Sequence, residues 1–363
     1  MIEEKPGDPK GRRKFLKGAA MLSGGALLGT TVDLRKPTAA AATSESAVGR
    51  RVARTPNERF ESLPDYPFKP HYVRINAGDR DGTQLRVHYI DERPSDAAKA
   101  SGETILLVHG NPSWSYLYRH VIPPLVAAGH RCVAIDLVGM GKSDKPTDRF
   151  LYTYQHHLNW LREAVFDRLD LRDVTMVCHD WGGLLGLLLL ADQPDRFRRV
   201  VASNTSGPRE GGTDLGPGWA YLAKFMQFTQ RTEQLEPGQI IEDFTLTKID
   251  PAVRAAYNAP FPGDAYLHGV RRWSVLIPIT ESDEANELIS QAWEVLETLQ
   301  TPFLCVFSDK DHVTGGNSTH LTSRIPGAQG QPHTTITNAA HFLQEDKASE
   351  FTMAIDNFIR STS

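Results

Sequence analysis

Residues 174–184 read Val174-Thr-Met-Val-Cys-His-Asp180-Trp-Gly-Gly-Leu184 and decide the fold of this chain. The run 174–178 is short and apolar, which is typical of a buried strand, and the apolar run after Gly183 indicates a helix. Cys178 and Gly182 are small residues two positions on either side of Asp180, so the turn between strand and helix can be tight. The stretch therefore predicts strand, sharp turn and helix, with a carboxylate at the apex.

The rest of the chain alternates β-rich runs with helix-compatible segments, for example 154–169 and 183–190. The other β-rich runs are residues 85–90, 104–108, 132–135, 200–203, 303–307 and 334–337. This alternation predicts a mostly parallel sheet flanked by helices. Between 207 and 300 the pattern is helical only, at 219–228, 240–244 and 284–299. We therefore predict an α/β core at 66–206 and 301–363, with an inserted all-helical cap at 207–300.

Composition and charge exclude several classes of protein. The 363 residues are 40% hydrophobic and 23% charged, as in ordinary globular proteins. The net charge is -4 and no long basic run occurs, so neither nucleic acid nor an anionic membrane surface is an expected partner. Cys132, Cys178 and Cys305 lie in apolar runs without CxxC spacing. We expect buried thiols, not disulfides or a zinc or redox site.

The first 42 residues have the pattern of an export signal. Arg12-Arg13-Lys14-Phe15-Leu16-Lys17 precedes a Gly- and Ala-rich stretch at 18–32 and small residues at 38–42. The paired arginines resemble a bacterial twin-arginine signal, which predicts passage through the twin-arginine translocase to the periplasm or the exterior. A spanning helix needs about 20 apolar residues, so no stable membrane insertion is expected. The alternative is a disordered basic arm on a cytoplasmic enzyme. Polar residues 43–65 are predicted to form a linker.

The stretch around Asp180 resembles the nucleophile elbow of α/β-hydrolases, in which a serine usually occupies the apex. A serine alkoxide attacks an acyl carbon, whereas a carboxylate attacks an electrophilic sp3 carbon and forms an alkyl ester. An Asp that opens a helix can also be a simple N-cap. The strand before Asp180 and the two glycines after it favour the nucleophile.

A second turn follows the strand at 104–108 and reads His109-Gly-Asn-Pro-Ser-Trp114. In the α/β-hydrolase pattern, such a His-Gly-x-Pro turn supplies one backbone N–H to an oxyanion hole, and the residue after the nucleophile supplies the other. These positions are Asn111 and Trp181. Their side chains are neutral N–H donors as well, so we expect them to bind a leaving halide. The alternatives are a turn former before proline for Asn111 and simple packing for Trp181.

The base and its acid partner are expected late in the chain, because nucleophile, acid and histidine follow in that order in this fold. Residues 338–343 read Asn-Ala-Ala-His-Phe-Leu after the last strand, so His341 is the candidate base. Asp311 precedes His-Val-Thr after the strand at 303–307 and is the candidate acid. Asp309 is the competing acid, although a turn-capping role suits it better.

Together these motifs resemble the haloalkane dehalogenase family over about residues 66–359. The matching stretches are residues 109–119, 137–146, 178–183, 257–262 and 340–345. The resemblance implies hydrolysis of a halogenated alkane to a primary alcohol, halide and a proton through an ester on Asp180, with no metal or organic cofactor. Another subfamily places a glutamate acid near Asn204, where this chain has no carboxylate. Trp219 of the cap is a further candidate halide donor.

Two other functions remain open at this point. An epoxide hydrolase shares the fold and the Asp nucleophile and activates its substrate with cap tyrosines, for which Tyr221, Tyr257 and Tyr266 are candidates. Its loop usually carries an aromatic residue where this chain has Asn111. A non-catalytic binding protein on the same fold is the remote alternative, and the complete set of nucleophile, acid and base argues against it. We expect a monomer.

Overall fold

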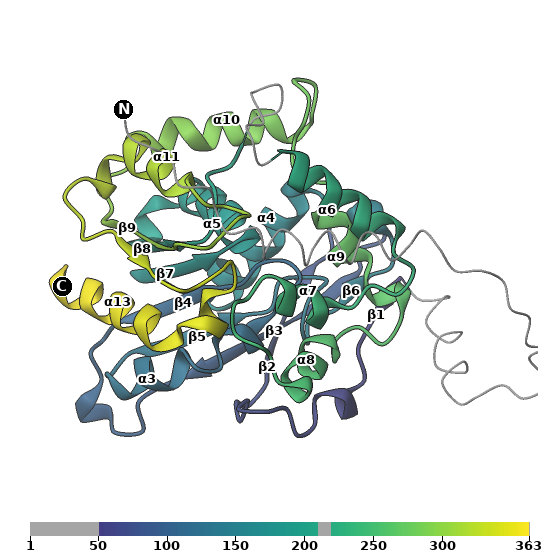
Figure 1. Ribbon diagram of the computed structural model, residues 1–363, viewed down its shortest axis with the longest axis horizontal. Helices are drawn as coiled ribbons and strands as arrows, with labels where there is room; N and C mark the ends of the chain where they lie inside the picture. The colour runs from purple at the N-terminus through teal and green to yellow at the C-terminus, as the bar shows by residue number, and fades with distance from the viewer. Residues whose placement is uncertain (1–50, 210–218, 363) are drawn as a thin grey trace, which may run out of the picture. The chain divides into compact units, whose positions relative to one another are not determined.

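The computed structural model describes residues 51–209 and 219–362, which are organised around an eight-stranded sheet of order β10-β9-β8-β7-β4-β5-β3-β2 (Figure 1). The strands are β2 His71–Asn76, β3 Gln84–Glu92, β4 Thr104–Val108, β5 Arg131–Ile135, β7 Val174–His179, β8 Phe197–Ser203, β9 Phe303–Ser308 and β10 Thr334–Ile336. β3 runs antiparallel to both β2 and β5, and the remaining pairs are parallel. The predicted mostly parallel sheet is confirmed. β2 was missed because its burial does not follow a clear alternation.

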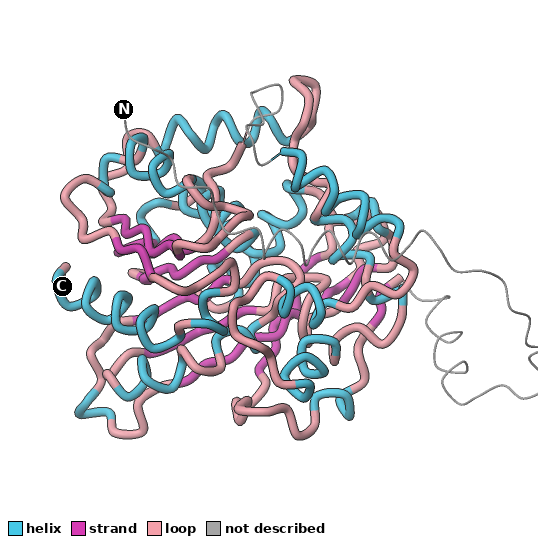
Figure 2. The backbone as a smooth tube through the Cα atoms, viewed as in Figure 1, coloured by secondary structure: helices cyan, strands magenta, loops and turns pink. Residues whose placement is uncertain are grey.

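Helices cover both faces of this sheet, as Figure 2 shows. One face is covered by α4 Tyr154–Arg162, α5 Trp181–Asp192, α10 Ala285–Leu296 and α11 Asn317–Arg324. The other face is covered by α3 Ile122–Ala127 and α13 Ala348–Ser361. Side chains alternate between the two cores along each strand. In β4, Leu106 and Val108 enter the first core, whereas Ile105 and Leu107 enter the second.

The carboxyl ends of the central parallel strands meet at one edge of the sheet. Val108 pairs with Cys178, Cys178 with Ala202, and Ala202 with Cys305, so these four residues form one row across β4, β7, β8 and β9. The turns that follow these strands therefore lie side by side. Open α/β sheets bind their ligands at this edge.

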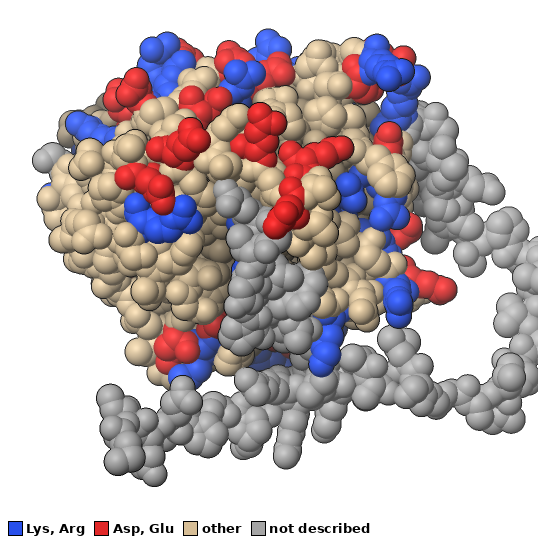
Figure 3. All heavy atoms as spheres, turned by 90° about the horizontal axis from the view of Figure 1, so that it is seen from above, with Lys and Arg blue, Asp and Glu red and all other residues tan. Residues whose placement is uncertain are grey.

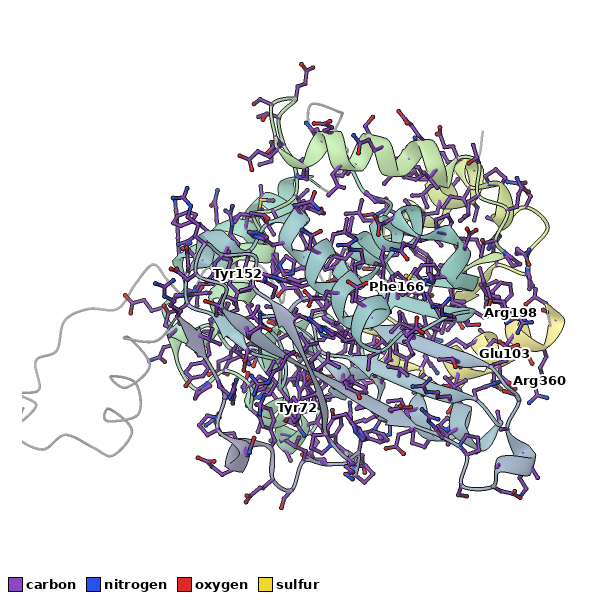
Figure 4. All side chains as sticks on the ribbon, turned by 180° about the vertical axis from the view of Figure 1, so that it is seen from behind. Tyr72, Glu103, Tyr152, Phe166, Arg198 and Arg360 are labelled. Atoms are coloured by element: carbon purple, nitrogen blue, oxygen red, sulfur yellow. The ribbon has the colours of Figure 1, made fainter. Side chains whose placement is uncertain are left out.

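The opposite edge of the sheet carries two ion pairs to the buried Glu103, one with the buried Arg199 and one with the half-exposed Arg198. Arg199 at the start of β8 is fully buried and donates to Glu103 Oε2 at 2.7 Å and to the Thr362 carbonyl at 2.9 Å. Arg198 donates to Glu103 Oε1 at 3.0 Å. Figure 4 shows Glu103 and Arg198 at the far side of the molecule from Tyr152. This edge ties the end of α13 to the sheet and leaves the carboxyl edge free for chemistry.

Four helices with no strand between them form the described part of the cap: α6 Trp219–Arg231, α7 Pro237–Asp243, α8 Pro251–Asn258 and α9 His268–Trp273 (Figure 1). The predicted cap boundary at residue 300 stays a prediction. α10 packs against α5 and buries Ile289 and Trp293 in the core of the sheet. An amphipathic pattern predicts a helix but does not identify the surface that its apolar side contacts.

Within the predicted linker at 43–65, residues from Val52 onward contact other parts of the protein. β1 Val52–Ala53 pairs antiparallel with β6 Lys145–Pro146. Arg54 donates two hydrogen bonds of 2.7 Å to the buried Asp144 carboxylate, and Thr55 Oγ1 donates to the Pro260 carbonyl at 2.6 Å. The polar composition of this segment reflects polar partners in the folded protein. Residues 1–50, which include the predicted signal and the start of the linker, lie outside the described residues.

The remaining expectations concern cysteines and surface. Cys132, Cys178 and Cys305 are buried free thiols in β5, β7 and β9, as expected. Among residues 51–209 and 219–362, no helix combines the length and the apolar character that crossing a membrane requires. On the face drawn in Figure 3, acidic and basic side chains are both scattered over the surface.

Candidate active site

The turn between β7 and α5 holds Asp180 in a rare backbone conformation, with φ 53° and ψ -126°. Such a conformation costs about 1–3 kcal/mol in a residue other than glycine and needs support from its surroundings. Thr205 Oγ1 donates to the Asp180 carbonyl at 2.7 Å, and the Asp180 N–H donates to the Asn204 carbonyl at 3.2 Å. A Cβ atom on Gly182 would lie 2.2 Å from the Val108 carbonyl oxygen, so only glycine fits there. The predicted strand, sharp turn and helix are therefore present.

The Asp180 carboxylate lies between backbone donors and His341. The Asn111 N–H donates to Asp180 Oδ1 at 2.7 Å, and the Trp181 N–H also donates to this carboxylate. Asp180 Oδ2 lies 3.3 Å from His341 Nε2. Burial raises the pKa of Asp180, but the hydrogen bond and the attraction to His341 outweigh it and lower that pKa. The carboxylate is thus ionised, as a nucleophile must be.

His341 contacts Asp311 through the other nitrogen of its ring. His341 Nδ1 lies 3.2 Å from both carboxylate oxygens of Asp311, whose side chain is fully buried. Asp311 also accepts hydrogen bonds from Val313 N, at 2.8 Å, and from Thr314 Oγ1. Burial opposes ionisation of Asp311, but His341 and these donors lower its pKa. The competing candidate, Asp309, instead accepts from Lys310 Nζ at 2.8 Å.

The two carboxylates change the protonation of His341. Burial alone lowers the pKa of His341, but attraction to Asp311 and the hydrogen bond to Asp180 raise it to about 10. The ring is therefore an imidazolium between two carboxylates while Asp180 carries its charge. Among the described residues, no cluster of His, Cys, Asp and Glu side chains is arranged to hold a metal ion.

The backbone of His341 is fixed by two side chains that sequence reasoning did not assign to the site. His179 Nε2 and Asn204 Nδ2 each donate to the His341 carbonyl at 2.8 Å. Burial and the neighbouring His341 lower the pKa of His179 to about 4, so its ring is neutral. Asn204 also donates to the Ala340 carbonyl at 2.9 Å. The available signal was their position, since polar residues at the ends of buried parallel strands meet at one edge.

The candidate halide donors lie around Asp180. Asn111 Nδ2 donates to the Val270 carbonyl of α9 at 3.3 Å, and Asn111 Oδ1 is buried without a hydrogen-bond partner in the described part of the chain. The Trp181 indole packs edge-on against Trp273, with ring centroids 4.8 Å apart. α9 of the cap therefore contacts both candidates. Trp219 begins α6, but its side chain lies outside the described residues.

Comparison with known proteins shows which family this chain resembles. A family model of the alpha/beta hydrolase fold matches residues 103–348. A haloalkane dehalogenase from Psychrobacter cryohalolentis is 48% identical over 309 residues, which cover 85% of this chain and 98% of that protein. A haloalkane dehalogenase from Mycolicibacterium paratuberculosis is 43% identical over 299 residues, 82% of this chain and 95% of that protein. Among solved structures, the haloalkane dehalogenase DpaA from Paraglaciecola agarilytica has a TM-score of 0.74 at 33% identity, covering 86% of this chain and 99% of its own.

The buried Asp180 carboxylate beside a His341–Asp311 pair, the family match over most of the chain and relatives with this much identity all lead to the same assignment. The chain belongs to the haloalkane dehalogenase family of the α/β-hydrolase fold.

Proposed function

We propose that the protein is a haloalkane dehalogenase that hydrolyses the carbon–halogen bond of 1-haloalkanes to a primary alcohol, halide and a proton. The observation that carries this proposal is the buried Asp180 carboxylate, which accepts the Asn111 N–H at Oδ1 and faces His341 at Oδ2. This arrangement supplies a carbon-directed nucleophile, a base and an oxyanion site without a metal or an organic cofactor.

In the first step, an Asp180 oxygen attacks the halogen-bearing carbon in line. A C–O bond forms, the carbon–halogen bond breaks, and its electron pair leaves with the halide. The side-chain N–H groups of Asn111 and Trp181 bind the departing anion in this proposal. These donors are neutral, so they add no second cation beside a carboxylate that already faces the His341 imidazolium.

In the second step, His341 removes a proton from water, and the resulting oxygen nucleophile attacks the ester carbonyl carbon of Asp180. The oxyanion forms at Asp180 Oδ1, where the Asn111 N–H already donates at 2.7 Å. Collapse of this intermediate releases the alcohol. Esterification removes the Asp180 charge that helps to raise the pKa of His341 to about 10, so this pKa falls. The imidazolium then loses its proton to solvent, and a larger fraction of the ring is neutral and able to accept the proton from water at neutral pH.

A His341→Gln variant incubated with 1-bromobutane tests this mechanism. We expect halide release to stop after one equivalent, because the alkyl ester forms but is not hydrolysed. Mass spectrometry of peptides should locate a butyl group on Asp180. Asp180→Asn is the matched control and should carry no adduct. Full turnover by His341→Gln without an adduct would contradict the proposed roles.

The epoxide hydrolase alternative has less support. Of its three candidate tyrosines, Tyr257 is fully buried and donates its hydroxyl hydrogen bond to Glu345. Tyr266 is half-buried in the cap, and the side chain of Tyr221 lies outside the described residues. Assays of halide release from 1-bromobutane and of styrene oxide opening compare the two activities directly.

We also propose that residues 1–42 are a twin-arginine export signal and that the enzyme acts in the periplasm or outside the cell. The support is the Arg12-Arg13 pair before an apolar stretch. In addition, the Psychrobacter match covers 98% of that protein but 85% of this chain, so this chain has residues beyond the match. A reporter fused to residues 1–50 should be exported, and Arg12→Lys with Arg13→Lys should block export, whereas Lys5→Arg should not. Export of the double-lysine variant at the normal level would contradict the proposal.

A further inference from the structure

The short helix α12, Leu343–Asp346, begins two residues after His341 and ends with two adjacent carboxylates, Glu345 and Asp346. Successive helical residues point about 100° apart, so these two side chains reach different parts of the molecule. Both reach the cap, and each also contacts a loop of the active site. α12 therefore connects the cap to the chain around His341.

Asp346 joins a loop of the cap to the residue before His341. Its carboxylate accepts hydrogen bonds from Leu246 N at 2.9 Å and Thr247 N at 2.7 Å, both in the loop that follows α7. The same carboxylate accepts from Ala340 N at 2.8 Å. The Phe342 N–H donates to the Phe244 carbonyl at 3.3 Å, which adds a second contact on the other side of His341.

Glu345 joins α8 of the cap to the loop that supplies Asn111. It accepts from both terminal nitrogens of Arg119, of which Nη2 lies 2.8 Å from Glu345 Oε2, and from the hydroxyl of Tyr257 in α8. Arg119 and Glu345 expose only 3% and 6% of their side chains. The Arg119 guanidinium lies 4.3 Å from the Tyr116 ring centroid, and Tyr257 packs edge-on against the same ring at 5.1 Å. The pair is thus buried, bidentate and enclosed by aromatic rings.

We propose that Glu345 and Asp346 are positioning residues that couple the placement of His341 to the cap segment 244–257. The coupling rests on the roles proposed above for Asp180 and His341. One carboxylate fixes the backbone next to the base, and the other fixes the loop that carries the Asn111 backbone donor. Displacement of this cap segment therefore displaces groups that act on the Asp180 ester.

The two steps of the reaction depend differently on this coupling. Formation of the ester uses the Asp180 carboxylate and the halide donors and requires no proton transfer to His341. Hydrolysis of the ester requires His341 to reach a water and the Asn111 N–H to reach the oxyanion. Loss of the coupling should therefore slow ester hydrolysis much more than ester formation, a separation that general destabilisation does not produce.

Single-turnover experiments with 1-bromobutane measure the two steps separately, since rapid quenching and mass spectrometry follow the butyl group on Asp180. The test variants are Asp346→Ala and Glu345→Gln in the full chain. Glu350→Ala is the matched control, because Glu350 is an exposed acid on the adjacent helix whose ion pair with Lys347 is 3.3 Å long. We expect adduct decay to slow about tenfold or more in both test variants, because small misplacements of reacting groups cost rate. Adduct formation should stay within about twofold of wild type in Asp346→Ala, whereas Glu345→Gln should slow formation too, but less than decay, because the loop that it loosens also carries the Asn111 side chain.

Asp346→Asn and Tyr257→Phe extend the test, since they keep most of the packing and decide the question if Asp346→Ala does not fold. Equal slowing of both steps, or unchanged decay in folded variants, would overturn the coupling. His341→Gln serves as the reference: if it forms no adduct, the proposed roles of Asp180 and His341 fail. If it accumulates adduct while the Glu345 and Asp346 variants turn over normally, only the coupling fails.

Discussion

The Asp180 side chain is held by groups that come from separate turns at one edge of the sheet. Asn111 follows β4 and donates to Oδ1, Thr205 follows β8 and supports the strained backbone, and His341 follows β10 and faces Oδ2. The energetic cost of the positive φ is thus offset by several hydrogen bonds that also set the direction of the carboxylate. A single additional carbon atom close to the Asp180 side chain should be enough to disturb this arrangement.

Gly110 lies directly beside the Asp180 side chain. A Cβ atom there would lie 2.2 Å from Asp180 Oδ1 and 2.5 Å from Asp180 Cβ. We expect Gly110→Ala to lower kcat/KM for 1-bromobutane about a hundredfold, because the nucleophile must move away from its in-line position. Halide release measures the rate, and thermal unfolding checks the fold. Gly263→Ala is the control, since no atom lies within 4 Å of its added Cβ. Wild-type activity in Gly110→Ala would show that this contact does not constrain Asp180.

The pKa of His341 should differ between the free enzyme and the alkyl-enzyme. In the free enzyme, Asp311 and Asp180 raise this pKa to about 10. The ester on Asp180 is uncharged, so the pKa in the alkyl-enzyme should lie lower. Adduct hydrolysis needs the neutral ring and should therefore fall as pH falls through this lower value. An NMR titration of His341 in the free enzyme and a pH profile of adduct decay give the two values. Equal values would contradict this account.

Among the elements, those with local signals were predictable and those defined by distant contacts were not. The strand, turn and helix around Asp180 follow from an apolar run and two glycines. Chain order selected His341 and Asp311, and the structure places these two residues beside each other, with His341 also facing Asp180. No pattern marks His179 and Asn204 as supports of His341, because their acceptor lies 162 and 137 residues further along the chain. Likewise, the sequence does not show whether α10 and β1 pack against the core or lie on the surface. That depends on the distant segments that they contact in the folded protein.

β6 contains Lys145, whose titration should make the free energy of unfolding depend on pH. Lys145 is fully buried and donates to the carbonyls of Gly141 at 2.8 Å and Ser143 at 2.9 Å. Burial lowers its pKa to about 7, against attraction to Asp136 and Asp144. Unfolded lysine titrates near pH ~10.4, so between about pH 7 and 10 the unfolded state binds more protons and the free energy of unfolding rises with pH. Below about pH 7, Lys145 is charged in both the folded and the unfolded state, so it adds no pH dependence to the free energy of unfolding.

Urea unfolding of the wild type and of Lys145→Met tests this expectation. The difference in unfolding free energy, wild type minus variant, should rise by on the order of 3 kcal/mol from pH 6.5 to 9.5. His341 has the opposite sign: its raised pKa adds stability that is complete below about pH 6.5 and is lost towards pH 10. That term is present in both proteins and cancels in the difference. Lys310→Met, which removes an exposed lysine, is the control. A difference that does not change with pH would contradict the prediction.

For the whole molecule, charge and architecture agree with an uncharged substrate. The net charge of -4 is small for 363 residues, and a haloalkane needs no electrostatic steering towards the site. The chemistry lies at the carboxyl edge of the sheet between core and cap, whereas the ion pairs of Glu103 and Arg199 close the amino edge. The expected monomer stays a prediction for size-exclusion chromatography with light scattering, and the relative DpaA is tetrameric.

Residues 51–65, which precede the first strand of the eight-stranded sheet, contact both the core and the cap. Their removal should therefore lower the stability of the whole molecule. Besides the Arg54 and Thr55 contacts, Arg59 Nε donates to the Ala259 carbonyl at 2.7 Å, next to the end of α8. A chain that begins at Arg51 retains these contacts, whereas one that begins at Tyr66 leaves the fully buried Asp144 without its bidentate partner. We expect the shorter chain to lose about 2 kcal/mol or more of unfolding free energy, since the buried carboxylate then has only Arg86, with Nε 4.0 Å from Asp144 Oδ1, as a charged partner.

Urea unfolding of the two chains at neutral pH measures this loss, and Arg54→Met in the longer chain isolates the ion pair from the β1–β6 pairing. That variant should account for part of the loss, because the Thr55 and Arg59 contacts to the end of the cap remain. The shorter chain should also show a higher KM for 1-bromobutane than Arg54→Met, since it alone releases Ala259 and Pro260. Equal stability and equal KM in both chains would mean that residues 51–65 act as the linker that their composition indicates.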